Sequence, residues 1–324
     1  MYSFSQLKDI VNNYIKTNEF NKKPVDLYKP INYILSLGGK RLRPAMVLAA
    51  YNLYFVNIEK YLKPAIGLEI FHNFTLLHDD IMDNADIRRN ETTVHKKWNE
   101  NTAILSGDAM LILAYDFFTD LPNEKFKKVF LEFNRTGLEV CEGQQYDLDF
   151  EKQKNVSIAE YIKMIELKTA VLLASSLKIG GILANATDAD LQNLYNFGKY
   201  LGLTFQLKDD FLDVYGNVEN FGKKIGGDIR ENKKTFLLIS ALNNANNADY
   251  KRLTGLLNDK QITNNKKISQ VIKIYDKLNI KQIAIDKMHE YQEIALEYLE
   301  KINVEKSKKT ILFNLAEQLL NRVN

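Results

Sequence analysis

Apolar residues recur at helical spacing along most of the chain. Between residues 66 and 81, and again between 191 and 205, an apolar side chain returns every third or fourth position, as on a helix with one buried face. Residues 161–181 are apolar on most sides and end on two glycines, a pattern typical of a buried helix that ends at a glycine. Residues 285–324 mix apolar and charged positions at the same spacing. We predict helices in all four segments.

No stretch of useful length alternates between apolar and polar residues, so the pattern predicts no substantial strand. The chain of 324 residues contains only 15 Gly and 5 Pro, and so few helix breakers favour long helices. No shift in composition marks a boundary between domains. We therefore predict an all-α fold of ten or more helices in one domain spanning residues 1–324.

Charge and cysteine content limit the classes of partner. The chain has 44 basic and 41 acidic residues, a balance that argues against a general nucleic-acid-binding protein. Cys141 is the only cysteine, which fits a reducing compartment. The N-terminal residues lack an apolar signal core, and no apolar run reaches the roughly 18 residues needed to cross a bilayer. We expect a cytoplasmic protein with no transmembrane segment.

Two segments carry the same aspartate spacing at the end of an apolar helix. The first contains Asp79, Asp80 and Asp83, and the second contains Asp209, Asp210 and Asp213. Residues four apart share a helix face, so the outer aspartates of each segment project together. One such cluster could be a solvated helix end, but two copies on apolar helices favour a role in binding cations.

Carboxylate oxygens are hard ligands that select Mg²⁺ or Mn²⁺. Protein-bound Mg²⁺ usually takes one or two carboxylates together with substrate phosphates, so two facing clusters predict a shared polyphosphate substrate between them. Such a substrate also needs cationic side chains. The chain has candidate groups at residues 38–44, at Arg88-Arg89, at Lys168, and at residues 223–234.

Each basic group has an ordinary interpretation as a solvated surface. Two of them follow the aspartate clusters, however, and two lie beside glycines that let the backbone approach a ligand. Lys168 lies within an apolar segment, where its spacing fits two interpretations equally. The side chain either reaches solvent along the helix, or it holds a phosphate or faces a developing cation in a dry pocket.

Taken together, these motifs resemble the trans-polyprenyl diphosphate synthase family, which includes farnesyl and geranylgeranyl diphosphate synthases. The resemblance covers residues 38–234. It rests on GGKRLRP at 38–44, HDDIMD at 78–83 with the two following arginines, GDAML at 107–111, GQxxD at 143–147, Lys168-Thr169, FQLKDDFLD at 205–213 and GKKIGGDIRENK at 222–233. The family often has R-G-x-P-T after the arginines, where this chain reads Arg89-Asn90-Glu91-Thr92-Thr93.

The resemblance implies an all-α fold with a central cavity, usually as a homodimer. It implies three Mg²⁺ ions, with Mn²⁺ able to replace them. Asp79 and Asp83 would hold two ions and Asp209 the third, and the supporting carboxylates would be Asp80, Asp210 and Asp213.

The resemblance also divides the cationic groups between two substrates. The allylic diphosphate would be held by Arg88, Lys168, Lys233 and either Lys223 or Lys224, a choice that the motif leaves open. Isopentenyl diphosphate would be held by Gly39, Lys40, Arg43, His72 and Arg89. Without the resemblance, His72 would be interpreted as a core histidine.

The implied reaction is a prenyl transfer. The allylic C–O bond breaks, the double bond of isopentenyl diphosphate attacks the resulting carbocation, and the released diphosphate takes a proton. Thr169 and Gln206 would stabilise the cation. Phe74, five residues before Asp79, is expected to limit the length of the growing chain.

Phe74 without an insertion between Asp79 and Asp83 favours geranylgeranyl diphosphate (C20) as the product, with farnesyl diphosphate (C15) as the alternative. A longer-chain synthase, a class I terpene cyclase and a non-catalytic subunit of a heteromeric synthase fit less well. The repeated aspartate motif argues against a cyclase, and the intact clusters argue against a non-catalytic subunit.

Overall fold

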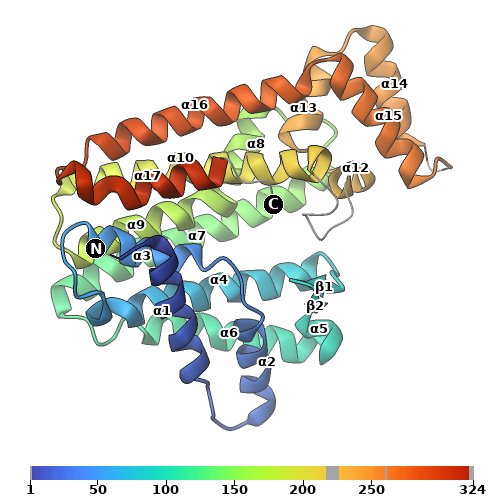
Figure 1. The fold of residues 1–324 in the computed structure, drawn as a ribbon. Helices are drawn as coiled ribbons and strands as arrows, with labels where there is room; N and C mark the ends of the chain where they lie inside the picture. The colour runs from blue at the N-terminus through green and yellow to red at the C-terminus, as the bar shows by residue number, and fades with distance from the viewer. Residues whose placement is uncertain (1, 217–225, 260, 321–324) are drawn as a thin grey trace. The chain divides into compact units, whose positions relative to one another are not determined.

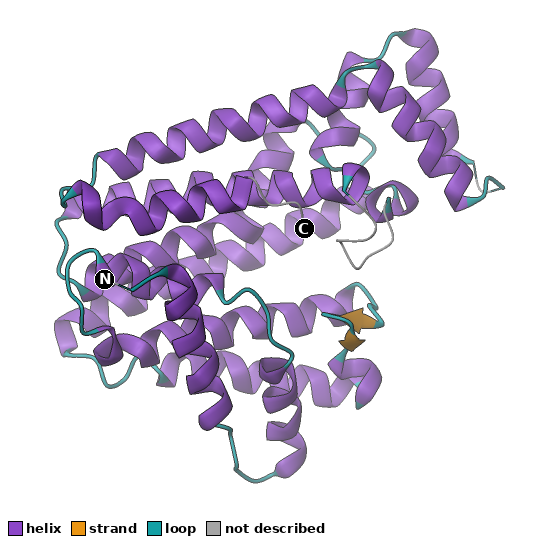
Figure 2. Ribbon diagram, in the orientation of Figure 1, coloured by secondary structure: helices purple, strands orange, loops and turns teal. Residues whose placement is uncertain are grey.

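The computed structural model describes residues 2–216, 226–259 and 261–320, and most of them are helical (Figures 1 and 2). The all-α prediction is confirmed. Within the described residues the only strands are β1 (Ile87–Arg88) and β2 (Glu91–Thr92), which form a short antiparallel hairpin. No helix among the described residues is both long and apolar enough to span a membrane.

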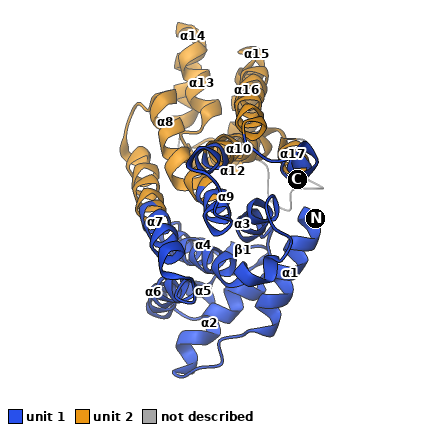
Figure 3. Cartoon of the chain, turned by 90° about the vertical axis from the view of Figure 1, so that its left-hand side faces the viewer, with its two compact units in different colours: residues 1–135, 175–195, 302–312 blue, residues 136–174, 196–301, 313–324 orange. Residues whose placement is uncertain are grey.

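The chain forms two compact units (Figure 3). Unit 1 comprises residues 1–135, 175–195 and 302–312, and unit 2 comprises residues 136–174, 196–301 and 313–324. Four of the five boundaries fall within helices, α7 (Asn123–Lys152), α9 (Val171–Leu183), α10 (Asp188–Tyr215) and α17 (Lys306–Leu320), and the fifth lies between residues 301 and 302, just before α17.

Unit 1 is built around the long apolar helix α4 (Leu62–Met82), which packs on α6 (Glu100–Asp116). Gly67 permits the close approach, since a Cβ there would lie 3.0 Å from the Ala114 carbonyl oxygen. This unit also contains the β1–β2 hairpin, α1 (Phe4–Thr17), α2 (Val25–Ser36), α3 (Leu42–Asn52), the 3₁₀ helix η1 (Ile58–Tyr61) and α5 (Val94–Lys97).

Unit 2 has its own apolar core, which includes Tyr161, Leu207 and Phe236. Its helices are α8 (Ile158–Ile165), α12 (Gly227–Glu231), α13 (Phe236–Asn244), α14 (Asn247–Asn258), α15 (Asn264–Lys277) and α16 (Ile280–Glu300). The segment η2 (Glu166–Ala170) is a single π-helical turn between α8 and α9. Such turns are rare and frequently occur at functional sites.

The predicted helical segments at 66–81, 161–181 and 191–205 are present, and the segment 285–324 contains the end of α16 and all of α17, with a break at residues 301–305 and residues 321–324 outside the described residues. One predicted end is wrong. The glycine pair at 180–181 does not terminate its helix, because α9 continues to Leu183. A Cβ at Gly180 would lie 2.2 Å from the Val47 carbonyl oxygen, so this glycine allows α9 to pack closely on α3. The left-handed residue that follows the helix is Asn185, with φ of 56°.

Candidate active site

The first aspartate cluster lies at the C-terminal end of α4 in unit 1. The Asp83 amide donates to the Asp79 carbonyl at 2.9 Å, so the helical spacing of the two residues is retained. The side chain of Asp79 is 18% exposed and Asp83 is exposed, whereas Asp80 is buried with 2% of its surface accessible. The outer carboxylates of this cluster therefore face outward while the middle one faces the protein.

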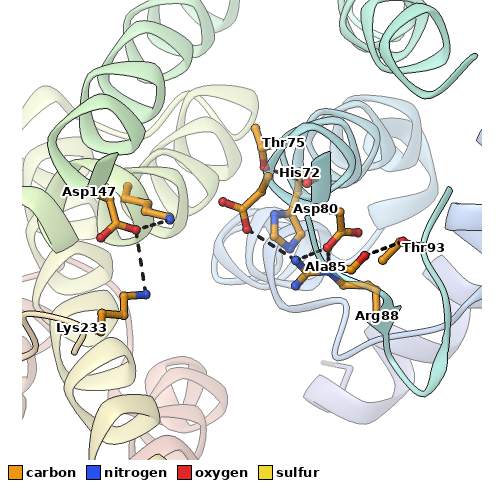
Figure 4. A network of polar contacts seen from close by, with 10 residues as sticks. His72, Thr75, Asp80, Ala85, Arg88, Thr93, Asp147 and Lys233 are labelled. Atoms are coloured by element: carbon orange, nitrogen blue, oxygen red, sulfur yellow. Dashed lines mark hydrogen bonds and ion pairs between the residues drawn. The ribbon is translucent and has the colours of Figure 1, made fainter. Parts of the chain in front are cut away.

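The buried Asp80 holds Arg88. Arg88 donates from Nε and Nη2 to Asp80 Oδ1 at 2.8 and 2.6 Å, and its Nη2 lies 3.5 Å from Asp79 Oδ2 (Figure 4). Burial raises the pKa of Asp80, while the bonds to Arg88 act against that rise. Burial disfavours the charge on Arg88, but its bonds to Asp80 and the nearby carboxylates leave its pKa raised.

The short hairpin after α4 carries the two adjacent arginines, one at the end of its first strand and one in its turn. Arg88 is the last residue of β1, and Arg89 and Asn90 both have positive φ, 55° and 65°, as in the two-residue turn that matches strand twist. The turn that replaces the usual R-G-x-P-T sequence is therefore a tight hairpin. Thr93 Oγ1 closes its base by donating to the Ala85 carbonyl at 2.7 Å.

Three residues expected to hold isopentenyl diphosphate lie together in unit 1. Arg43 Nη1 lies 2.9 Å from His72 Nε2, and Arg89 Nη1 donates to the Gly38 carbonyl. Gly39 has φ of 132°, a conformation that other residues rarely adopt, and a Cβ there would lie 2.9 Å from Arg89 Cζ. Lys40 is exposed beside them.

The protonation of this group follows from hydrogen-bond chemistry. A guanidinium can only donate, so His72 Nε2 accepts from Arg43 and the imidazole is neutral with its proton on Nδ1. Burial, followed by the charges of Arg43 and Arg89, lowers the pKa of His72 well below its usual value. Burial also lowers the pKa of Arg43 to about 10, and its Nε is buried without a hydrogen-bond partner. An anion would satisfy that donor.

The second aspartate cluster lies within α10 in unit 2 and repeats the pattern of the first. Asp210 is buried with 6% of its surface accessible, whereas Asp209 and Asp213 are partly exposed. Asp210 accepts from Tyr161 Oη and, at 3.1 Å, from Gln206 Nε2. Asp213 Oδ2 accepts from the Asp228 amide at 2.9 Å, which ties the cluster to α12.

The predicted catalytic pair of unit 2 lies on the π-helical turn. Thr169 Oγ1 donates to Gln206 Oε1 at 3.0 Å, and Lys168 Nζ lies 2.6 Å from Asp147 Oδ2. Lys233 Nζ also approaches Asp147, at 3.9 Å (Figure 4). The Lys168 side chain is 26% exposed and its ammonium group is held by a carboxylate.

Asp147 contacts two of the predicted site residues, and sequence reasoning assigned it no role. Burial acts to raise its pKa, but the charges of Lys233 and Lys168 bring it below the usual value. It thus stays ionised and gathers both lysines. The signal was the final position of the GQxxD motif, which we noted without a function.

Lys223 and Lys224, one of which we expected to contact the allylic diphosphate, lie outside the described residues. Tyr161, which binds Asp210, and Glu69, which lies among the arginines of unit 1, were missed. Neither belongs to a motif. Glu69 was detectable only as a single carboxylate in the apolar segment 64–71.

The donor set of the clusters suits a divalent cation that prefers oxygen. Within residues 2–216, 226–259 and 261–320, no group of three or more His, Cys, Asp or Glu side chains is arranged to hold a metal. An ion bound by one or two carboxylates and by phosphate oxygens requires no such group. The outward-facing aspartates therefore fit ions that are completed by a substrate.

The chain matches the family model described as polyprenyl synthetase over residues 24–275. The chain belongs to the polyprenyl synthetase family. It is 42% identical over 221 residues to a geranylgeranyl diphosphate synthase of Methanosarcina mazei, with 68% of each chain covered. It is 36% identical over 317 residues to that of Saccharolobus solfataricus, with 96% of this chain and 93% of the other covered.

Solved structures of the family have the same fold. A crystal structure of a geranylgeranyl pyrophosphate synthase matches 99% of both chains with a TM-score of 0.95 and 42% identity. A polyprenyl synthase from Caulobacter crescentus, 26% identical with a TM-score of 0.85 over 99% of this chain and 96% of the other, was crystallised with calcium and isoprenyl diphosphate. The resemblance seen in the motifs is thus confirmed, and this polyprenyl synthetase is an enzyme, a short-chain prenyltransferase.

Proposed function

We propose that this prenyltransferase condenses isopentenyl diphosphate with an allylic diphosphate and releases geranylgeranyl diphosphate. The observation that carries the proposal is the position of Phe74 in α4. Its ring contacts His78 at 4.8 Å between centroids and Phe71 at 5.6 Å, and Phe71 contacts Phe133 at 5.0 Å. An aromatic ring supported from behind in this way, five residues before Asp79, would stop a growing prenyl chain.

Three of the four outer aspartates of the two clusters are the proposed magnesium ligands. Asp79 and Asp83 would hold two ions and Asp209 the third, while Asp80, Asp210 and Asp213 orient Arg88, Tyr161 and α12. When bound, Mg²⁺ would neutralise the diphosphate leaving group and so polarise the allylic C–O bond. The oxygen-rich donor set supports this assignment.

The cationic side chains of the two units are proposed to bind diphosphate oxygens. Arg88, Lys168 and Lys233 would bind the allylic diphosphate, together with Lys223 or Lys224. Each of the first three rests on a carboxylate, Asp80 or Asp147, which fixes its position before the substrate arrives. Such preorganised cations stabilise the charge that develops on the leaving group.

Isopentenyl diphosphate would bind beside Arg43, His72 and Arg89, with Gly39 and Lys40 completing the subsite. Support comes from the unpaired Arg43 Nε and from the space that Gly39 leaves for Arg89. The neutral His72 would orient the Arg43 guanidinium by accepting its hydrogen bond.

The oxygen dipoles of Thr169 and Gln206 would face the allylic cation. Their hydrogen bond to each other, and that from Gln206 to Asp210, hold both side chains in place. The double bond of isopentenyl diphosphate then attacks the cation, and the diphosphate that has left takes the proton. Exclusion of water would prevent capture of the cation.

The test is to incubate the purified chain with radiolabelled isopentenyl diphosphate, Mg²⁺ and one of three primers, dimethylallyl, geranyl or farnesyl diphosphate. We expect products that accumulate at C20 with every primer. Accumulation at C15 would make the chain a farnesyl diphosphate synthase instead. Failure to condense with any primer would contradict the proposal and favour a non-catalytic subunit.

We further propose that the enzyme acts as a homodimer. Ile104, Leu105 and Ile112 of α6 and Phe130 and Leu131 of α7 are between 36% and 66% exposed. The two helices adjoin at this surface, because the rings of Tyr115 and Phe130 are 5.5 Å apart. Contiguous exposed apolar residues mark interaction surfaces, and a second copy of the chain would cover them.

A further inference from the structure

A buried carboxylate, Glu69, lies among the arginines of unit 1 and has no place in the proposed reaction. Only 2% of its side chain is exposed, and its Oε1 lies 2.5 Å from Arg41 Nη1. The same oxygen accepts from Asn73 Nδ2 at 3.1 Å, and Asn73 Oδ1 lies 3.4 Å from Arg89 Nη1. Glu69 thus connects to one of the arginines proposed to bind isopentenyl diphosphate.

Arg41 itself cannot serve as a substrate ligand. It is 3% exposed, and all three of its side-chain nitrogens are engaged. Nη1 binds Glu69, Nη2 donates to the Leu35 carbonyl at 2.5 Å, and Nε donates to Asn12 Oδ1 at 3.0 Å. Within the run Lys40 to Arg43, Arg41 therefore belongs to the interior of the unit.

Glu69 also acts on the neighbouring cations through its charge. Burial lowers the pKa values of Arg43 and Arg89, and each of these arginines disfavours the charge on its neighbours. In both arginines the charge of Glu69 acts in the opposite direction and favours the charged form. The carboxylate thus offsets part of the repulsion among cations that no substrate has yet neutralised.

We infer that Glu69 is a built-in counter-charge that limits the affinity of the isopentenyl diphosphate subsite. An incoming diphosphate meets cations whose charge is already partly compensated, so it gains less than it would from uncompensated arginines. A moderate affinity also matters for the reaction, because the diphosphate held here becomes the diphosphate of the lengthened product and must leave the subsite before the next condensation. This inference rests on the proposed function of the same residues.

The test is the order of affinities in three variants, measured by calorimetric titration with isopentenyl diphosphate and Mg²⁺ in the absence of a primer. Glu69→Gln removes the negative charge and should tighten binding by about tenfold. Arg41→Gln removes a positive charge and should weaken it by a similar factor. The double variant, with a neutral hydrogen-bonded pair, should bind within about threefold of the wild-type enzyme.

This order separates a role in tuning charge from a purely structural role. If the pair only held the fold together, all three variants would bind more weakly, and that result would overturn the inference. Equal affinity in all four proteins would overturn it too. If one of the single variants does not fold, the other single variant can still be compared with the double variant. That comparison still tests whether the change in affinity for isopentenyl diphosphate has the expected direction.

Two controls isolate the effect. Glu132 is a buried carboxylate of unit 1 that pairs with Lys178 and Arg135 instead, so Glu132→Gln should leave the affinity for isopentenyl diphosphate unchanged. Binding of farnesyl thiodiphosphate, an allylic analogue with an inert C–S bond, should change less than twofold in the Glu69 and Arg41 variants. Failure of the wild-type enzyme to bind isopentenyl diphosphate would instead contradict the proposed function.

Discussion

At the scale of single residues, the middle aspartate of each cluster is buried and the two outer aspartates are more exposed. Asp80 and Asp210 are 2% and 6% exposed and bind protein partners, whereas their outer neighbours are more exposed. Spacing alone could not separate these roles, since it treats all three aspartates of a cluster as candidate ligands. The difference arises because the middle residue faces Arg88 in one cluster and Tyr161 in the other.

Replacing Asp79 or Asp209 by Ala should lower kcat by at least about 10²-fold. Each substitution removes a proposed ligand of Mg²⁺, whose positive charge would stabilise the leaving group. Chelation of divalent cations should abolish turnover in the wild-type enzyme, and added Mg²⁺ should restore it. Steady-state incorporation of labelled isopentenyl diphosphate measures both effects. Asp116→Ala, at an exposed aspartate at the end of α6, is the control. Rates equal to this control would refute the metal assignment.

Phe74→Ala should lengthen the product beyond that of the wild-type enzyme. The smaller side chain opens space in front of Phe71, so the prenyl chain can extend further before it meets a wall. Chain-length analysis of the products after full conversion measures the change. Phe55→Ala, at a phenylalanine that is 48% exposed, should leave the product unaltered. An unchanged product from Phe74→Ala would show that this ring does not limit the chain.

His72 should make the stability of the enzyme sensitive to mild acid. Its pKa in the folded protein lies well below 6.5, so between these two values the unfolded chain binds more protons. Stability from His72 is therefore complete above pH 6.5 and declines on acidification, by at most about 1.4 kcal/mol per pH unit. Between pH 7.5 and pH 5.5, the melting temperature of the wild-type enzyme should fall further than that of His72→Gln. Parallel losses in both proteins would contradict the prediction.

At the scale of elements, glycines decide where helices can approach closely. Gly107 of α6 faces His78 of α4, and a Cβ there would lie 2.2 Å from Nε2. Gly143 of α7 lies against the π-helical turn, where a Cβ would be 2.2 Å from the Lys168 backbone nitrogen. The glycines of the motifs GDAML and GQxxD thus act through packing, because the first lets α6 approach α4 and the second lets α7 approach the π-helical turn.

Gly143→Ala should displace the turn that carries Lys168 and Thr169. The new methyl group collides with backbone and not with a flexible side chain, so the expected loss of stability is about 1–3 kcal/mol and kcat should fall by at least about tenfold. Gly255→Ala, in α14 with nothing within 4 Å, is the matched control. It should raise stability by about 0.5–1 kcal/mol and leave activity unchanged. Equal activities in the two variants would show that the contact at Gly143 is not needed.

At the scale of the whole molecule, the apolar residues exposed on α6 and α7 support our proposal that the enzyme acts as a homodimer. Leu105 and Ile112 lie seven residues apart on α6 and are 60% and 66% exposed. The sequence resemblance implied a homodimer but did not locate its surface. Helical periodicity assigns such residues to a buried face, and only the tertiary fold shows that neighbouring helices leave them uncovered.

Leu105→Glu should therefore convert the dimer into monomers, since a charge at the centre of an apolar interface is costly to desolvate. Size-exclusion chromatography with light scattering measures the mass of the particle. The control is Val56→Glu, at a residue that is 67% exposed on the turn after α3. A wild-type enzyme that is monomeric at micromolar concentration would contradict the prediction.

By itself, the sequence determined the fold class, the family, and the residue types of both aspartate clusters. These depend on local spacing, because helical periodicity and short motifs connect residues that are near one another in the chain. The tertiary structure alone decided which aspartates face inward, that Asp147 contacts Lys168 and Lys233, and that the buried Glu69 pairs with Arg41. Each of these depends on contacts between residues far apart in the sequence, where burial and charge take their values from the whole fold.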